Sequence, residues 1–337
     1  MPRPVANPPN PWHSAHVEWL GEPPAAELSV YEERARSVLS ANDSPDLAFR
    51  YSVNPYRGCF HGCSYCYARP THQYLDWGAG TDFERRLVVK VNAPEVLARE
   101  LARPALRGQT IVFSGNTDCY QPLEAHYGLT RRCLEVCLAR RQPVALVTKA
   151  ALVRRDVDVL AALAKRTRCR VFVSLAFRDS AVARAVEPFA PSPKKRLEAL
   201  AALSAAGVPT GIALAPLIPA LNEADVPELL ERAHAAGARQ AFLTLLRLSG
   251  PVHEVFVTRL AEAFPDRARH VLAALDDVRA GDRREGRFHE RMRGRGARWA
   301  MTEQLFRTTC RRLGIATGDG VQAPPGPRER QLGLPWA

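Results

Sequence analysis

This chain of 337 residues lacks the features of membrane-bound and secreted proteins. No stretch approaches the run of about 20 apolar residues that spans a bilayer, and the segment from Met1 to Pro9 has no apolar targeting core. The eight cysteines occur without a secretory leader, which argues against a disulfide framework and favours a reducing compartment. We therefore expect a soluble cytoplasmic protein with no membrane partner.

The chain has one group of three closely spaced cysteines, and no second pair of cysteines lies near it in the sequence. Cys59, Cys63 and Cys66 follow the spacing C-x3-C-x2-C, with the aromatic Tyr65 just before the last cysteine. A structural zinc site needs four ligands, commonly two C-x2-C pairs, and only His61 lies near enough in the sequence to complete one. Three thiolates on one loop instead suit three irons of a 4Fe–4S cluster. The fourth iron is then open to bind and reduce a small molecule.

The charge of the chain is positive and unevenly distributed. The formal net charge is +12, and residues 279–298 are dense in arginine. Such a segment predicts a nucleic-acid partner. The alternative is the ordinary surface of a basic, Ala- and Arg-rich protein, because charge alone is a poor guide to partners.

Short apolar segments alternate with amphipathic ones from residue 49 onward. This pattern predicts a parallel sheet covered by helices, and about six repeats favour a partial (β/α)6 barrel, an α/β fold, over a full eight-fold one. Predicted strands lie at 51–53, 110–113, 144–148, 170–175, 210–214 and 241–246. Predicted helices lie at 129–140, 157–165, 193–206, 225–236 and 252–264.

The pattern divides the chain into four parts. Residues 1–45 form a proline-rich N-terminal arm with a short helix near 32–40, and residues 46–264 form the barrel. Residues 265–318 form a C-terminal helical extension, and the Pro- and Gly-rich residues 319–337 form a disordered tail. Because chemistry in such barrels lies at the carboxyl ends of the strands, the cysteine loop after the first strand falls at the active site.

The cysteine loop resembles the signature of the radical S-adenosylmethionine (radical SAM) superfamily. The resemblance extends to its spore photoproduct lyase-like branch over roughly residues 45–315, and is closest to uncharacterised bacterial relatives of the lyase. Where the lyase has a hydrogen-donating cysteine after the second strand, this chain has Gly115 or a neighbour. The matching segments are 54–59, 65–69, 114–124, 148–150, 154–156, 187–188 and 215–219.

The resemblance implies two cofactors, a 4Fe–4S cluster and S-adenosylmethionine (SAM). The open iron would chelate the amino and carboxylate groups of SAM. One electron from a flavodoxin- or ferredoxin-like donor would cleave SAM to a 5′-deoxyadenosyl radical, which takes a hydrogen from the substrate. The protein would position the cofactors and exclude water.

The resemblance also implies SAM contacts at three strand ends. Asn116, Thr117 and Asp118 would accept from the SAM amino group, with an Asx-type turn as the alternative. Lys149 would pair with the SAM carboxylate or, alternatively, cap the sheet. Ser174 would bind the ribose or methionine part, or serve as a satisfied core hydroxyl.

Three further residues are candidates for the radical chemistry itself. Tyr65 and Tyr67 match tyrosines that take part in radical transfer in the lyase, and packing around the cluster is the alternative that we favour for them. Cys119 is the thiol nearest to the position of the lyase cysteine and is a candidate hydrogen donor. Its alternative is a small buried residue, as free cysteines usually are, and as we expect for Cys133 and Cys137.

Three functions compete at this stage. The first is a radical SAM enzyme with an unknown substrate, and nucleic acid is one candidate class. The second is a non-enzymatic iron–sulfur protein for redox or binding, and the third is a zinc-dependent nucleic-acid-binding protein. The strand-end residues Asn116, Lys149 and Ser174 favour the enzyme, since a pure electron carrier needs no SAM pocket.

Overall fold

The computed structural model describes residues 27–281 and 287–318. Its main sheet has eight strands in the order β11-β10-β9-β8-β7-β6-β3-β2, and a second sheet has the order β1-β5-β4. The strands are β1 (Ser29–Glu33), β2 (Leu39–Ala41), β3 (Tyr51–Val53), β4 (Tyr56–Arg57), β5 (Arg86–Lys90), β6 (Ile111–Phe113), β7 (Val144–Thr148), β8 (Cys169–Ser174), β9 (Thr210–Leu217), β10 (Gln240–Leu245) and β11 (Ala316–Thr317).

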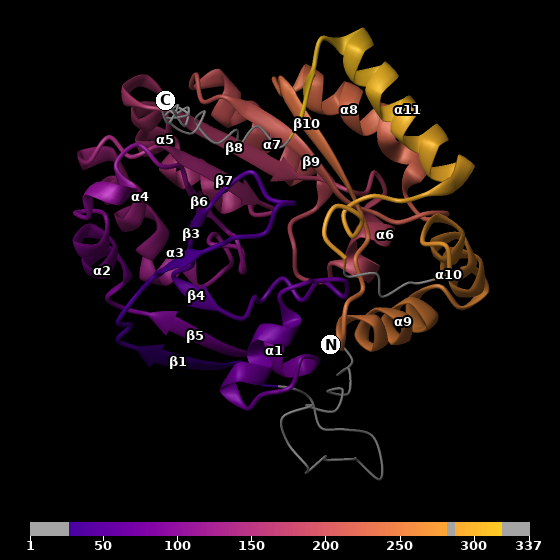
Figure 1. Cartoon of the computed structure of the whole chain (residues 1–337), viewed down its shortest axis with the longest axis horizontal. Coiled ribbons are helices and arrows are strands. Elements are labelled where there is room, and N and C mark those ends of the chain that lie inside the picture. Colours follow the sequence, from indigo (N-terminus) through magenta and orange to yellow (C-terminus); the bar gives the residue numbers. More distant parts are fainter. Residues whose placement is uncertain (1–26, 282–286, 319–337) are drawn as a thin grey trace, which may run out of the picture.

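Helices cover the outer face of the main sheet, which curves as a partial barrel (Figure 1). The helices are α1 (Thr81–Arg85), α2 (Ala93–Glu100), α3 (Glu124–Tyr127), α4 (Leu129–Ala139), α5 (Val157–Arg166), α6 (Ser180–Val186), α7 (Pro193–Ala205), α8 (Val226–Ala235), α9 (Val252–Ala263), α10 (Pro265–Val278) and α11 (Gly296–Leu313). Four 3-10 turns, η1 (Arg69–Leu75), η2 (Pro104–Leu106), η3 (Ala151–Asp156) and η4 (Glu223–Asp225), complete the elements.

The six strands β3, β6, β7, β8, β9 and β10 are parallel neighbours, as the repeat pattern predicts. The partial barrel is therefore confirmed, and each predicted strand and helix of the repeat lies within a residue or a few of its predicted bounds. The sheet gains two edge strands that were not predicted: β2 runs antiparallel to β3, and β11 runs parallel to β10.

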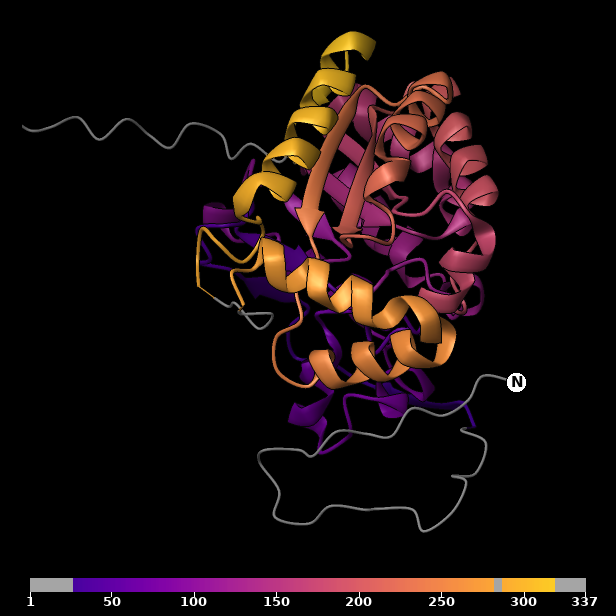
Figure 2. The same cartoon turned by 90° about the vertical axis from the view of Figure 1, so that its right-hand side faces the viewer.

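Two large apolar clusters hold the sheet to its helices. One joins β3, β6 and β7 to α2, α4 and α5, and it includes the fully buried Cys133 and Cys137, which confirms them as core residues. The other joins β8, β9 and β10 to α6, α8, α9, α10 and α11. Figure 2 shows α9 and α10 packed side by side below the sheet, with α11 along its edge.

The predicted helix near 32–40 is wrong, because this segment forms β1 and β2 instead. Side chains from α2 and its N-terminal boundary bind the backbone between the two strands. The amide of Asn92 accepts from the Ala35 N–H at 2.8 Å and donates to the Ala35 carbonyl at 3.0 Å. Glu100 accepts from the N–H groups of Val38 and Leu39, each at 3.1 Å. These tertiary bonds take the partners that a helix would need and hold the chain extended.

The C-terminal extension is helical through α11, but it ends in β11 and so adds a strand to the sheet. The predicted disordered tail, 319–337, lies outside the described residues, as does the first part of the arm. No helix among the described residues has the length and apolar character that crossing a bilayer requires.

Candidate active site

The cysteine loop begins after β4 and lies at the carboxyl end of β3, where the sequence predicts it. Two tight turns shape the loop: the Gly62 N–H donates to the Cys59 carbonyl and the Cys66 N–H to the Cys63 carbonyl, each at 3.2 Å. Gly62 has φ +65°, and a Cβ there would stand 2.7 Å from Oε2 of Glu84. Only glycine fits this position without displacing Glu84.

A buried arginine holds the loop from inside. Arg69 is fully buried, and its guanidinium donates to the Gly62 and Cys63 carbonyls, each at 3.0 Å. It also donates to Oε2 of Glu84 at 2.8 Å, and Arg259 of α9 binds the other oxygen of that carboxylate at 2.9 Å. Charge-assisted hydrogen bonds from two arginines to one buried carboxylate fix geometry as well as charge, so this network sets the curvature of the loop.

A glutamine from the next strand end clamps the start of the loop. The fully buried Gln121 accepts from the Phe60 N–H at 2.9 Å and donates to the Gly58 carbonyl at 3.0 Å. The Ser64 N–H donates to the carbonyl of Val186 at 2.9 Å, which ties the loop to α6 as well. Sequence reasoning missed Gln121 as a loop-holding residue, although it lies inside the matching segment 114–124.

The three cysteines of the loop share one buried environment. Cys59 and Cys63 are each 7% exposed, Cys66 is half-buried, and none of the three forms a disulfide. Burial raises the pKa of the Cys63 thiol to about 12, and it raises the pKa of Cys59 and Cys66 as well. Metal binding must therefore displace protons from these thiols.

The arrangement of the cysteines fits a cluster. Each thiol lies close enough to another for their charges to interact. Among the described residues, no three His, Cys, Asp or Glu side chains converge as the ligands of a single metal ion. A 4Fe–4S cluster does not require that convergence, because each cysteine binds its own iron.

Lys149 provides a cation beside the cysteines whose ammonium makes no hydrogen bond within the described part of the chain. It follows β7, and its Nζ lies 5.6 Å from the ring centroid of Tyr65, with Cys63 and Glu187 as electrostatic neighbours. Cys63 and Glu187 interact with this ammonium through their charges only, and within the described part of the chain no hydrogen bond or ion pair to it is present. A half-buried ammonium whose donors are available fits the carboxylate of SAM.

A buried ionic network lies behind Tyr65. The Tyr65 hydroxyl donates to Oε1 of Glu187, and Arg196 binds the other oxygen of that carboxylate. Arg196 also donates to the Ser174 carbonyl at 3.0 Å, so α7, β8 and the cysteine loop are joined. Burial alone would raise the pKa of Glu187, but Arg196 and Lys149 outweigh it and hold that pKa below its ordinary value. The structure thus places Tyr65 as a packed, hydrogen-bonded residue beside Lys149.

The three candidate side chains after β6 differ in how many hydrogen bonds they already make within the protein. Asp118 accepts from the Tyr120 N–H at 3.0 Å, which is the Asx-type turn, and from the Thr148 hydroxyl at 2.7 Å and the Lys149 N–H at 2.8 Å. The buried Thr117 hydroxyl donates to the Tyr56 carbonyl at 3.0 Å. Only Asn116 keeps its side chain largely available, with a single long contact of 3.5 Å to Thr71.

Ser174 and Tyr67 differ in how far they are exposed. The Ser174 hydroxyl is buried and donates to the Ala215 carbonyl at 3.3 Å, as the core-hydroxyl alternative expects, and its contact with SAM stays a prediction. Tyr67 is 54% exposed, and its hydroxyl donates to the Gly115 carbonyl at 2.7 Å. Its ring is therefore open toward a ligand, whereas that of Tyr65 is not.

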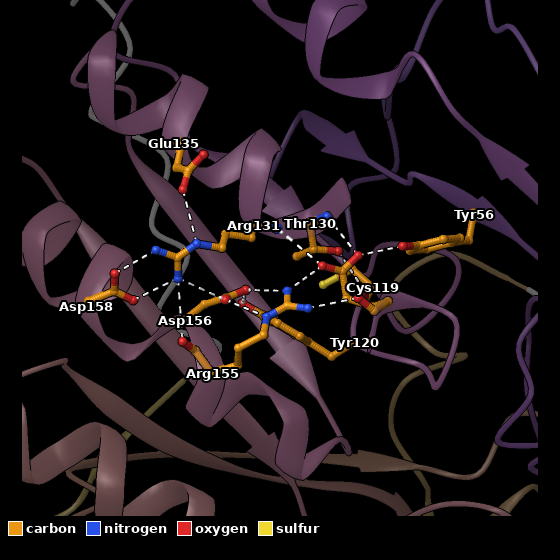
Figure 3. Close-up of polar contacts among 10 residues, drawn as sticks. Tyr56, Cys119, Tyr120, Thr130, Arg131, Glu135, Arg155, Asp156 and Asp158 are labelled. Atoms are coloured by element: carbon orange, nitrogen blue, oxygen red, sulfur yellow. Dashed lines mark hydrogen bonds and ion pairs between the residues drawn. The ribbon is translucent and has the colours of Figure 1, made fainter. Parts of the chain in front are cut away.

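Cys119 lies away from the opening of the site. It is fully buried in the apolar cluster under α2 and α4, and its carbonyl accepts from the Thr130 hydroxyl at 2.6 Å (Figure 3). This location favours the packing alternative, and hydrogen donation by Cys119 stays a prediction. Gly115 has no room for a cysteine in its place, because a Cβ there would stand 2.8 Å from the side chain of Ser52.

A second polar network, not predicted from the sequence, joins the loops after β6 and β7. Arg155 binds the buried carboxylates of Glu124 and Asp156, and Glu124 also accepts from the Tyr56 hydroxyl (Figure 3). Tyr120 donates to Asp156 at 3.0 Å. Arg155 and Asp156 fall in the matching segment 154–156, and their contacts hold the loops after β6 and β7 together.

Comparison with known proteins identifies the family. Residues 53–233 match the model of the Radical SAM superfamily. An uncharacterized protein of Mycobacterium tuberculosis strain H37Rv is 39% identical over 242 residues, 71% of each chain. An uncharacterized protein of Methanocaldococcus jannaschii is 28% identical over 203 residues, 59% of this chain and 72% of the relative.

Among solved structures, the fold is similar to spore photoproduct lyase complexed with dinucleoside spore photoproduct. The TM-score is 0.63 at 19% identity, over 89% of this chain and 87% of the lyase. The resemblance inferred from the residues is thus confirmed, both for the lyase-like fold and for the uncharacterised relatives. The chain belongs to the radical SAM superfamily.

Proposed function

We propose that this protein is an enzyme in which Cys59, Cys63 and Cys66 hold a 4Fe–4S cluster next to a SAM-binding site. When bound, this cluster supplies one-electron reductive cleavage of SAM, and the resulting 5′-deoxyadenosyl radical removes a hydrogen from the substrate. The observation that carries the proposal is the ammonium of Lys149, which lies beside the cysteines and makes no hydrogen bond or ion pair among the described residues.

The chain's own residues position the two cofactors. Lys149 supplies the charge for the SAM carboxylate, and the available amide oxygen of Asn116 suits the donor groups of the SAM amine. Arg69 and Gln121 keep the cysteine loop curled. Tyr65, held by Glu187, forms the surface over which Lys149 extends, so it positions Lys149 rather than reacting itself.

The electron donor is proposed from the chemistry of the family, and the substrate class from the arginine-rich segment. A flavodoxin- or ferredoxin-like protein remains the proposed donor, as the family chemistry implies. For the arginine-rich segment, the described part forms internal ion pairs: Arg287 and Arg295 with Glu290, Arg291 with Asp46, and Arg298 with Glu223. These pairs neutralise part of the charge, and a nucleic-acid partner stays a prediction that rests on the remainder.

One anaerobic experiment tests the proposal against its alternatives. The protein is reconstituted with iron and sulfide, mixed with SAM and dithionite, and assayed for 5′-deoxyadenosine by mass spectrometry, with Cys63→Ala as the control. We expect brown wild-type protein that forms 5′-deoxyadenosine and a control that does neither. A brown protein inert to SAM would support an iron–sulfur redox or binding protein, and a colourless, zinc-loaded protein would support a zinc-dependent nucleic-acid-binding protein.

The same assay then addresses the substrate. Fractions of candidate substrates are added in turn, and stimulation of 5′-deoxyadenosine formation identifies the active fraction. The cytoplasmic location expected from the sequence is compatible with this oxygen-sensitive chemistry and stays a prediction.

A further inference from the structure

Arg247 lies at the rim of the active site, at the carboxyl end of the last strand of the repeat. It follows β10 by two residues, and the chain on its N-terminal side is fixed. The Leu246 N–H donates to the Leu217 carbonyl at 2.8 Å, and the Leu246 carbonyl accepts from the buried Arg279 at 2.6 Å. The position of Arg247 is thus set by two neighbouring elements rather than by its own side chain.

The guanidinium of Arg247 has no partner within the described part of the chain. It is half-buried, and its Nε is fully buried without a hydrogen bond. Three other arginines of this region are engaged: Arg279 binds four backbone carbonyls, Arg291 binds Asp46, and Arg259 binds Glu84. A partly desolvated guanidinium without an acceptor is unfavourable, which points to an acceptor supplied from outside.

The surroundings of Arg247 are cationic and aromatic. Tyr67 and Arg291 lie close enough for their charges to interact with that of Arg247, and burial together with Arg291 lowers its pKa. Among the described residues, the carboxylate that interacts with Arg247 is Asp46, and it already binds the Arg291 guanidinium and the His289 N–H. The ring of Phe288 is 52% exposed and carries Arg291 at 4.4 Å from its centroid.

We propose that Arg247 binds an anionic group, a phosphate or a carboxylate, of the substrate, with the exposed ring of Tyr67 as the neighbouring contact surface. This inference rests on the proposed function, because it places the group beside Tyr67, the residue that follows the last cysteine of the loop. A guanidinium presents a fork of donors that suits both phosphate and carboxylate. The open aromatic ring favours a flat group attached to the anion.

Equilibrium dialysis of the reconstituted protein tests this site with three small probes. Phenyl phosphate and benzoate carry a ring with a phosphate or a carboxylate, and benzyl alcohol is their neutral counterpart. Arg247→Gln removes the charge, and Arg247→Lys keeps the charge but loses the fork. Arg140→Gln, at the exposed end of α4 on the outer layer, is the matched control for the loss of one positive charge.

We expect the wild type to bind one or both anions and to bind benzyl alcohol far more weakly. Arg247→Gln should weaken anion binding roughly ten- to a hundred-fold at wild-type iron content, because a charge-assisted bond is lost. The anion affinity of Arg247→Lys should lie between those of the wild type and Arg247→Gln, and that of Arg140→Gln should match the wild type. Tighter binding of phenyl phosphate would indicate a phosphate-bearing substrate, and tighter binding of benzoate a carboxylate-bearing one.

The proposal is overturned if the wild type binds neither anion, if benzyl alcohol binds as tightly as the anions, or if both Arg247 variants bind them like the wild type. Should Arg247→Gln fail to assemble iron, the comparison of Arg247→Lys with the wild type decides. The binding measurement needs no SAM cleavage. A wild type that forms no 5′-deoxyadenosine would therefore refute the proposed function separately from the anion site.

Discussion

Replacing Arg69 by methionine tests whether the cysteine loop is held from inside. Methionine keeps much of the volume but removes the hydrogen bonds that the guanidinium makes to Gly62, Cys63, Ala79, Gly80 and Glu84. The Glu84 carboxylate then keeps Arg259 as its one described cationic partner. The expected result is a less stable apo-protein that assembles less cluster.

The magnitude follows from the burial of the pair. Arg69 is fully buried and the side chain of Glu84 is 2% exposed. Removing one partner of a buried pair costs about 3–5 kcal/mol when the other charge is left uncompensated. Because Glu84 keeps Arg259, we expect a cost at the lower end of that range, about 3 kcal/mol. That is a large share of the roughly 5–15 kcal/mol by which proteins are stable. For a chain of this size it corresponds to a fall in melting temperature of roughly 4 °C.

Differential scanning fluorimetry of the apo-protein and iron content after reconstitution measure the two effects. Arg86→Met is the control, since its pair with Asp82 is a surface contact at 3.7 Å worth about 1 kcal/mol or less. If Arg69→Met melted with the wild type and bound as much iron, the account of the loop given above would be wrong.

Four further outcomes are expected. Cys63→Ala should abolish cluster assembly, as read from iron content and visible absorbance, and retained absorbance would remove it as a ligand. Lys149→Ala should weaken SAM binding roughly ten- to a hundred-fold with the cluster intact, and an unchanged dissociation constant from equilibrium dialysis would leave it a sheet-capping lysine. Cys119→Ala should form normal product at near wild-type yield with slightly lower stability if the thiol only packs, whereas SAM cleavage that stalls before product would establish hydrogen donation. The lowered pKa of Glu187 stabilises the fold above the unfolded-state value of about 4.3. This contribution is lost as the pH falls through the lower folded-state pKa, so urea midpoints of Glu187→Gln should fall less steeply than those of the wild type below about pH 5.

The fold of the repeat was predictable because its signals are local. The strand at 144–148 is a continuous apolar run and the helix after it has one apolar face, so β7 and α5 appear where the periodicity puts them. The segment 32–40 was not predictable in this way. Its extended form depends on Asn92 and Glu100, which are distant in the sequence and bind its backbone. Likewise, β11 has two residues and no pattern of its own.

The residues of the candidate site likewise differ in whether the local sequence reveals them. The cysteine spacing and the lysine at a strand end are visible in the sequence, and the structure brings Lys149 to Cys63. The side chains that hold the loop, Arg69 and Gln121, were missed, because their partners are backbone carbonyls and amides. Such bonds depend on where the chain returns in space, and no residue pattern records that.

The supports of the cysteine loop bear on when the site can form. Gln121, Val186 and the Arg259 that completes the carboxylate network of Glu84 all follow the loop, each further along the chain than the last. A nascent chain emerging from the ribosome therefore presents the three cysteines long before their surroundings exist. Iron delivered to the loop at that stage would meet a flexible peptide. The full set of contacts is available only once synthesis has passed α9, so we expect the proposed cluster to be inserted late in the maturation of this protein.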